Sequence, residues 1–111
     1  MKGTYLRFYV HEGQKHGGLL LYEWLLEIAR KSGIPGGSAF RAMAGFGRHG
    51  VFHEQHFFEL SGELPVEVEF LLPDDQADRL LETLKREQVN LFYAKAPAEF
   101  GVIEAKPTNT G

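Results

Sequence analysis

The strongest constraint on the fold of this 111-residue chain is the order in which two hydrophobic periodicities follow each other. Alternation of apolar and polar residues is typical of half-buried strands, and a 3.6-residue spacing is typical of amphipathic helices. The alternation is clearest where Leu6, Phe8 and Val10 share one side of an extended segment. The patterns predict strands at residues 4–10, 38–46, 66–70 and 90–96, a helix at residues 19–32 and a second helix that opens at residues 73–75.

The order β-α-β-β-α-β predicts an α+β fold of the ferredoxin-like type. In this fold two helices cover one face of a four-stranded antiparallel sheet. We expect residues 1–103 to form a single domain and residues 104–111 to be a disordered tail. Residues 11–18 are polar and contain glycine, and they are predicted to form a loop between the first strand and the first helix.

The sheet face that the helices leave uncovered needs an explanation. Its predicted occupants are Tyr5, Arg7, Tyr9, Glu67 and Glu69. Burying an apolar or aromatic side chain contributes roughly 1.5–3 kcal/mol, which disfavours leaving both tyrosines in water. An oligomer that joins these faces would cover the tyrosines and bring Arg7 to a glutamate. The alternative is a partly solvated face on which the tyrosine hydroxyls reach water.

Composition excludes several classes of protein. The chain has no cysteine, which rules out disulfides, thiolate metal sites and cysteine nucleophiles. Its formal net charge is −3 and its Lys and Arg residues are scattered, which argues against nucleic acid as a partner. We see neither a secretory signal nor an apolar run near the roughly 20 residues of a membrane span. We therefore expect a soluble cytoplasmic protein that is not membrane-embedded.

Three of the five histidines, His49, His53 and His56, lie within eight residues of one another. On a helix this spacing would place them on one face, where neutral imidazoles could bind a divalent metal. The glycines and aromatic residues around them favour extended chain instead, in which His53 and His56 point to opposite sides. A trimer could still gather three copies of one histidine around its axis. A trimeric metal-binding protein is therefore the alternative hypothesis.

An enzyme is not the expected function. His53 beside Glu54 or Glu59 could in principle move a proton. The chain nevertheless contains no nucleophile motif, no dinucleotide fingerprint and no phosphate-binding loop motif. We therefore predict no catalytic residues.

Several motifs resemble a known family. The segment LYEWLLEIARKSGIPGGSAFRAMAGFG, the later His53 and the segment LSGELPVEVEF are similar to the PII-like family catalogued as domain of unknown function 190. The resemblance covers roughly residues 4–96. The residues that match the family pattern are Leu21, Tyr22, Glu23, Ala29, Arg30, Gly33, Gly36 or Gly37, Arg41, Gly45, Phe46, Gly47, His53, Leu64 and Pro65. Ala42 departs from it, because the family usually has glycine there, and His49 and His56 are additions.

The resemblance implies a homotrimer whose sheets face inward, with a mobile loop at about residues 48–62. It also implies that a small effector binds in clefts between subunits and sets the conformation of this loop, which regulates a transporter, channel or enzyme. We expect the effector to be a small anion, with a nucleotide among the candidates. The segment AKAPAEFGVIEAK has no Gly-x-Gly-Lys nest of backbone amides, which argues against the phosphate-binding mode of the nucleotide-binding PII proteins.

The candidate effector-binding residues are Arg41, Gly45, Gly47, Arg48 and His53. Arg41 lies in a predicted strand, where it either pairs with Glu67 or Glu69 or faces an anion in the cleft. Arg48 either contacts an anion beside the glycines or is exposed to solvent. His53 can donate a hydrogen bond to a phosphate or carboxylate in a pH-dependent way.

Overall fold

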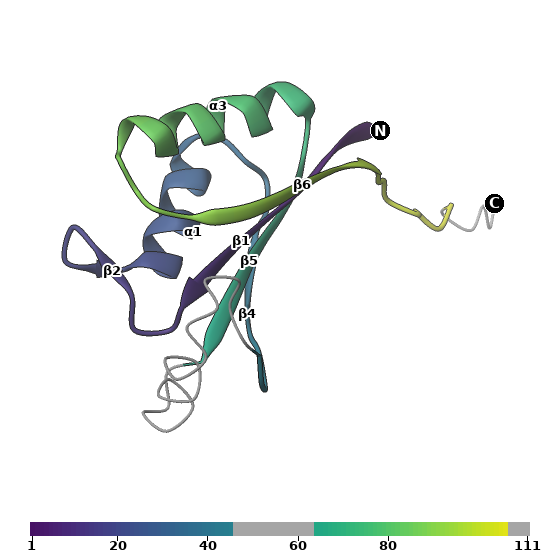
Figure 1. Cartoon of the computed structure of the whole chain (residues 1–111). Coiled ribbons are helices and arrows are strands. Elements are labelled where there is room, and N and C mark those ends of the chain that lie inside the picture. Colours follow the sequence, from purple (N-terminus) through teal and green to yellow (C-terminus); the bar gives the residue numbers. More distant parts are fainter. Residues whose placement is uncertain (46–63, 107–111) are drawn as a thin grey trace.

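The computed structural model describes residues 1–45 and 64–106. Its main sheet has the strand order β4-β5-β1-β6, and every neighbouring pair is antiparallel. Both helices lie on the same side of this sheet (Figure 1). The predicted ferredoxin-like fold is therefore confirmed. The elements are β1 (Lys2–His11), β2 (Lys15–His16), β3 (Leu19–Leu20), α1 (Leu21–Lys31), β4 (Ser38–Arg41), β5 (Pro65–Leu72), α3 (Asp74–Arg86) and β6 (Phe92–Glu99).

The segment between β1 and α1 differs from its prediction. Lys15–His16 and Leu19–Leu20 form a small hairpin, and the turn between them contains Gly17 and Gly18 with φ of 58° and 82°. A two-residue hairpin turn of this kind requires positive φ at both central positions, which glycine adopts without strain. The predictions of a plain loop at residues 11–18 and of a helix start at Leu19 are therefore wrong, because this local pairing takes the leucines into a strand.

Helix α1 forms because Leu21, Leu25 and Ala29 recur on one buried stripe. It ends as predicted at Gly33, whose φ is 83°. The Gly33 amide donates to the Arg30 carbonyl and the Ile34 amide donates to the Ala29 carbonyl, both at 3.1 Å. These two bonds form a Schellman cap, which satisfies carbonyls that the helix end would otherwise leave unpaired.

Helix α3 begins where the acidic residues predicted it. Asp74 and Asp75 lie in its first turn, and Lys85 and Arg86 lie in its last, as the helix dipole favours. Asp74 also accepts a hydrogen bond from the hydroxyl of Thr4, with 2.5 Å between the oxygens. Thr4 is the buried polar residue of the described core, so this bond ties α3 to β1.

The core fills the space between the helices and one face of the sheet. Alternate residues of β1 and β5 point into it, and the helices contribute their buried stripes. Within residues 1–45 and 64–106, neither helix is long and apolar enough to cross a membrane. The buried apolar side chains are Leu6, Phe8, Val10, Leu21, Leu25, Ala29, Ile34, Val66, Val68, Phe70, Leu72, Ala77, Leu80 and Leu84.

The strand bounds agree with the predictions except at the ends. The second predicted strand, residues 38–46, ends at Arg41, and residues 42–45 are not in a strand. The last strand is Phe92–Glu99 instead of residues 90–96. Of the expected tail at residues 104–111, the structure describes residues up to 106, so its disorder stays a prediction.

Candidate functional site: a cleft beside Arg41

Arg41 is the last residue of β4, and its guanidinium forms an ion pair with Glu12, which follows β1. In the sheet Arg41 lies opposite Val66, a core residue, so its side chain emerges on the side that carries the helices. Glu67 and Glu69 alternate with the core residues of β5 and point to the other face. The predicted pairing of Arg41 with Glu67 or Glu69 is therefore wrong.

A cleft of ≈180 Å³ lies between the end of β4 and the first turn of α1. Its volume suits a small oxyanion or one phosphate group, because sites that enclose drug-sized ligands usually measure roughly 300–1,000 Å³. A nucleotide bound here would therefore extend beyond the cleft. The residues that line it are Glu12, Tyr22, Ala39, Arg41 and Val66.

The chain enters and leaves residues 46–63 next to this cleft. The Ala42 amide donates to the Pro65 carbonyl at 2.8 Å, and the Glu12 amide donates to the Leu64 carbonyl at 2.9 Å. Gly45 lies so close to Pro65 that an added Cβ would be 3.6 Å from its Cγ. The predicted site residues Arg41 and Gly45 thus both lie where the two flanks of residues 46–63 meet.

The other predicted site residues, Gly47, Arg48, His49, His53 and His56, lie outside the described residues. Their effector-binding and metal-binding roles stay predictions. In the part of the chain that the structure does describe, no group of three His, Cys, Asp or Glu side chains could hold a metal ion.

Sequence reasoning missed Glu12 and Tyr22 as lining residues of the cleft. A single carboxylate after a strand carries no distinctive signal. The usable clue was its position, because the antiparallel register of β1 and β5 places His11 opposite Pro65. Any acidic residue just beyond His11 is therefore brought to the start of β5.

The uncovered face of the sheet carries a second organised group of side chains. The Nε of Arg7 donates to the Tyr5 hydroxyl at 2.7 Å, and Tyr5 donates to Glu69 Oε1 at 2.6 Å. The other guanidinium nitrogens of Arg7 lie 3.3 Å from Glu69 Oε1 and 3.7 Å from Glu67 Oε2. The guanidinium carbon is also within 5.3 and 5.9 Å of the Tyr5 and Tyr9 ring centroids. The predicted meeting of Arg7 with a glutamate thus occurs within one chain.

This network shifts the pKa values of its members. Burial raises the pKa of Tyr5, and the hydrogen bond from Tyr5 to Glu69 acts in the same direction. The hydrogen bond to Tyr9 is the largest cause that raises the pKa of Arg7. Arg7 therefore remains cationic and holds the two carboxylates in place on this face of the sheet.

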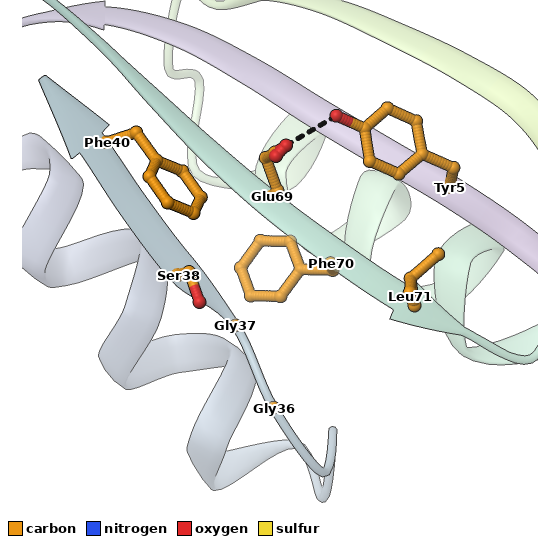
Figure 2. A pocket seen from close by; sticks show the side chains of 8 residues that line it. All are labelled: Tyr5, Gly36, Gly37, Ser38, Phe40, Glu69, Phe70 and Leu71. Atoms are coloured by element: carbon orange, nitrogen blue, oxygen red, sulfur yellow. Dashed lines mark hydrogen bonds between the residues drawn. The ribbon is translucent and has the colours of Figure 1, made fainter. Parts of the chain in front are cut away.

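A wider groove of ≈470 Å³ opens beside the network, at the beginning of β4. Figure 2 shows that Tyr5, Glu69 and Leu71 border it from β1 and β5, while Ser38 and Phe40 border it from β4. Phe40 and Leu71 are 54% and 46% exposed in a single chain. The uncovered face therefore presents large apolar side chains around a preformed polar centre.

Comparison with known proteins places the chain in a family. The sequence profile described as "DUF190: Uncharacterized ACR, COG1993" matches residues 3–90. The chain belongs to the DUF190 family. A UPF0166 protein of Aquifex aeolicus (strain VF5) is 34% identical over 85 residues, which cover 77% of this chain and 81% of that protein. Another UPF0166 protein, from Methanocaldococcus jannaschii, is 33% identical over 84 residues, or 76% of this chain and 77% of its own length.

The DUF190 chain also resembles solved PII-like structures. One is CPII, a nitrogen regulatory PII-like protein from Thiomonas intermedia K12, bound to ADP, AMP and bicarbonate. It matches with a TM-score of 0.62 and 15% identity over 92% of this chain and 91% of CPII. The same protein bound to ADP and bicarbonate matches with a TM-score of 0.63 at the same identity and coverage. At this identity the likeness establishes a shared PII-like fold.

Proposed function

We propose that this DUF190 protein is a non-enzymatic regulatory protein that binds a small anionic effector in the cleft beside Arg41. The observation that carries the proposal is the position of Arg41. Its cationic group borders a cleft at the point where residues 46–63 begin and end. Binding of the effector in the cleft thereby affects the segment at about residues 48–62. This segment acts on a transporter, channel or enzyme target.

The size of the cleft bears on the class of effector. Bicarbonate, a short carboxylate or one phosphate group fits a volume of ≈180 Å³, and the planar guanidinium of Arg41 suits such oxyanions. A nucleotide could place a phosphate there if a neighbouring subunit supplied the rest of the site. The PII-like protein CPII has been solved with both kinds of ligand, ADP or AMP and bicarbonate, which makes both classes suitable probes.

We further propose that the protein is a homotrimer joined through the uncovered sheet faces. Phe40, Leu71 and Phe92 are 54%, 46% and 44% exposed in the single chain. On the edge strand β6, Ala94 and Ala96 lie opposite Arg7 and Tyr5, and these small side chains allow a second sheet to approach closely. Covering such side chains contributes roughly 1.5–3 kcal/mol each when burial is complete.

We also propose that the protein works in the cytoplasm. The absence of cysteine is compatible with this reducing compartment.

Isothermal titration calorimetry with bicarbonate, inorganic phosphate, AMP and ADP tests the effector site. We expect at least one of these probes to bind and Arg41→Ala to weaken that binding at least tenfold. The matched control is Arg79→Ala, which removes the same charge from an arginine on α3 that is 69% exposed. Absence of binding by all four probes, or equal binding by both variants, would overturn the effector site.

Sedimentation velocity tests the interface. We expect a trimer for the unmodified chain and dissociation for Leu71→Asp, which places an uncompensated charge in the apolar face. The matched control is Leu19→Asp, at a leucine of similar exposure (47%) in the β2–β3 hairpin. A monomer at all concentrations, or a trimer that Leu71→Asp leaves intact, would contradict this interface.

A further inference from the structure

Glu12 supplies the carboxylate that pairs with Arg41 in the cleft. Its Oε1 forms the ion pair with Arg41 Nη2, and both side chains line the same cleft. The two side chains differ in exposure, because Glu12 is 26% exposed whereas Arg41 is 63% exposed. The Arg41 side chain is therefore largely accessible to solvent, while its Nη2 is in contact with Glu12.

We propose that Glu12 is a built-in competitor for the oxyanion site, which sets the affinity and the selectivity of the cleft. This inference rests on the proposed effector site and adds a specificity-determining residue to it. The ligand class is an oxyanion, namely bicarbonate, a carboxylate or a phosphate group. A ligand that binds Arg41 with two parallel hydrogen bonds, one of them from Nη2, must take over a donor that now faces Glu12.

Two physical effects act in the same direction. Glu12 holds part of the donor set of Arg41, which a guanidinium presents in a fixed planar geometry. The negative charge of Glu12 also repels any anion that approaches Arg41 in the cleft. A weakly charged or singly charged oxyanion suffers less from this repulsion than a doubly charged phosphate. Glu12 therefore favours ligands of low charge.

Glu12 also connects the cleft to the flank of residues 46–63. Its amide donates to the Leu64 carbonyl at 2.9 Å, so its backbone is held at the start of β5. Because the backbone of Glu12 is held there, its carboxylate remains near Leu64 when it is displaced from Arg41. Occupancy of the cleft thus changes the charge distribution at this strand end.

The experiment compares Glu12→Gln with the unmodified chain in calorimetric titrations with bicarbonate, inorganic phosphate and ADP. The substitution keeps the size of the side chain and removes its charge. We expect affinity to rise about three- to tenfold, with the largest gain for phosphate or ADP, and the gain to vanish in Arg41→Ala/Glu12→Gln. The matched control is Glu82→Gln on α3, which removes the same charge from an exposed residue that does not line the cleft.

Each outcome separates this inference from the proposed function. If the unmodified chain binds a probe and Glu12→Gln binds it equally or more weakly, the effector site stands and the competitor is overturned. If only Glu12→Gln binds, the competitor is supported, and the proposal that the unmodified chain responds to these anions fails. If neither chain binds any probe, both proposals are overturned, because a freed Arg41 should then have accepted phosphate.

Discussion

Arg7 on β1 and Glu69 on β5 lie directly opposite each other in the antiparallel register, and their Nη2 and Oε1 atoms are 3.3 Å apart. The same guanidinium donates to Tyr5, which in turn donates to Glu69. These groups form a closed polar arrangement on the sheet face opposite the helices. A charge that interacts with several partners on two strands contributes to the stability of the single chain before any oligomer forms.

Replacing Arg7 by leucine should lower the free energy of unfolding by about 1–2 kcal/mol, because charge-assisted hydrogen bonds are lost and Glu67 and Glu69 then repel each other. Urea denaturation at several protein concentrations measures the loss. Arg79→Leu is the control, since its ion pair with Asp75 is exposed and should contribute under about 0.5 kcal/mol. Equal losses in the two variants would show that the Arg7 network contributes no more than a surface ion pair.

The raised pKa of Tyr5 predicts a loss of stability at alkaline pH. A folded-state pKa above the ordinary value of 10.0 means that the protonated hydroxyl is favoured in the folded chain. This contribution is fully present below pH 10 and is lost as pH rises through the higher folded-state pKa. Absorbance titration of the tyrosines should show one hydroxyl that ionises late and disappears in Tyr5→Phe. A late hydroxyl that persists in Tyr5→Phe would assign it to another tyrosine.

Gly37→Ala should destabilise the fold by about 1–3 kcal/mol, whereas Gly36→Ala should be neutral or slightly stabilising. A Cβ at Gly37 would overlap the ring of Phe70, with 2.6 Å to its Cδ1 atom, while a Cβ at Gly36 would have no atom within 4 Å. Phe70 is 2% exposed and cannot move aside without disturbing the core. The two variants carry the same substitution at neighbouring positions, and thermal unfolding compares their stability. Similar melting temperatures would refute this role of Gly37.

Asp74→Ala should cost about 1–3 kcal/mol of stability, because it leaves the buried Thr4 hydroxyl without its acceptor. Asp75→Ala removes the neighbouring acidic residue from the same helical turn and should cost about 0.5 kcal/mol. The two denaturation midpoints measured in urea provide the comparison. If Asp75→Ala proved the more damaging change, helix-dipole and surface charge effects would outweigh the bond to Thr4.

The local patterns predicted every main element except the hairpin. The alternation around Phe8 and the spacing of Leu21 and Leu25 depend on side chains a few residues apart, so they survive in the sequence as readable signals. The pairing of Lys15 with Leu20 was missed because two-residue strands are too short to show any periodicity. The glycine pair at residues 17–18 was the available signal, since adjacent glycines favour a hairpin turn.

The candidate site was predicted in part. Arg41 and Gly45 were identified from a family pattern, and the structure places both beside one cleft. One of the two alternatives for Arg41, a pairing with Glu67 or Glu69, placed it on the wrong face, because a charge inside a strand can be paired correctly only when its side of the sheet is known. The roles of the remaining predicted site residues belong to the segment that the structure does not describe.

By itself the sequence determined the order of strands and helices and the side of each that enters the core, because hydrophobic periodicity is a local property of the chain. The tertiary structure alone decided that Glu12 meets Arg41, 29 residues away, and that Phe70 lies against Gly37. These contacts depend on strand order and register, which place distant residues side by side. The physical reason is that burial can be read along one segment, whereas a pairing is a property of two segments together.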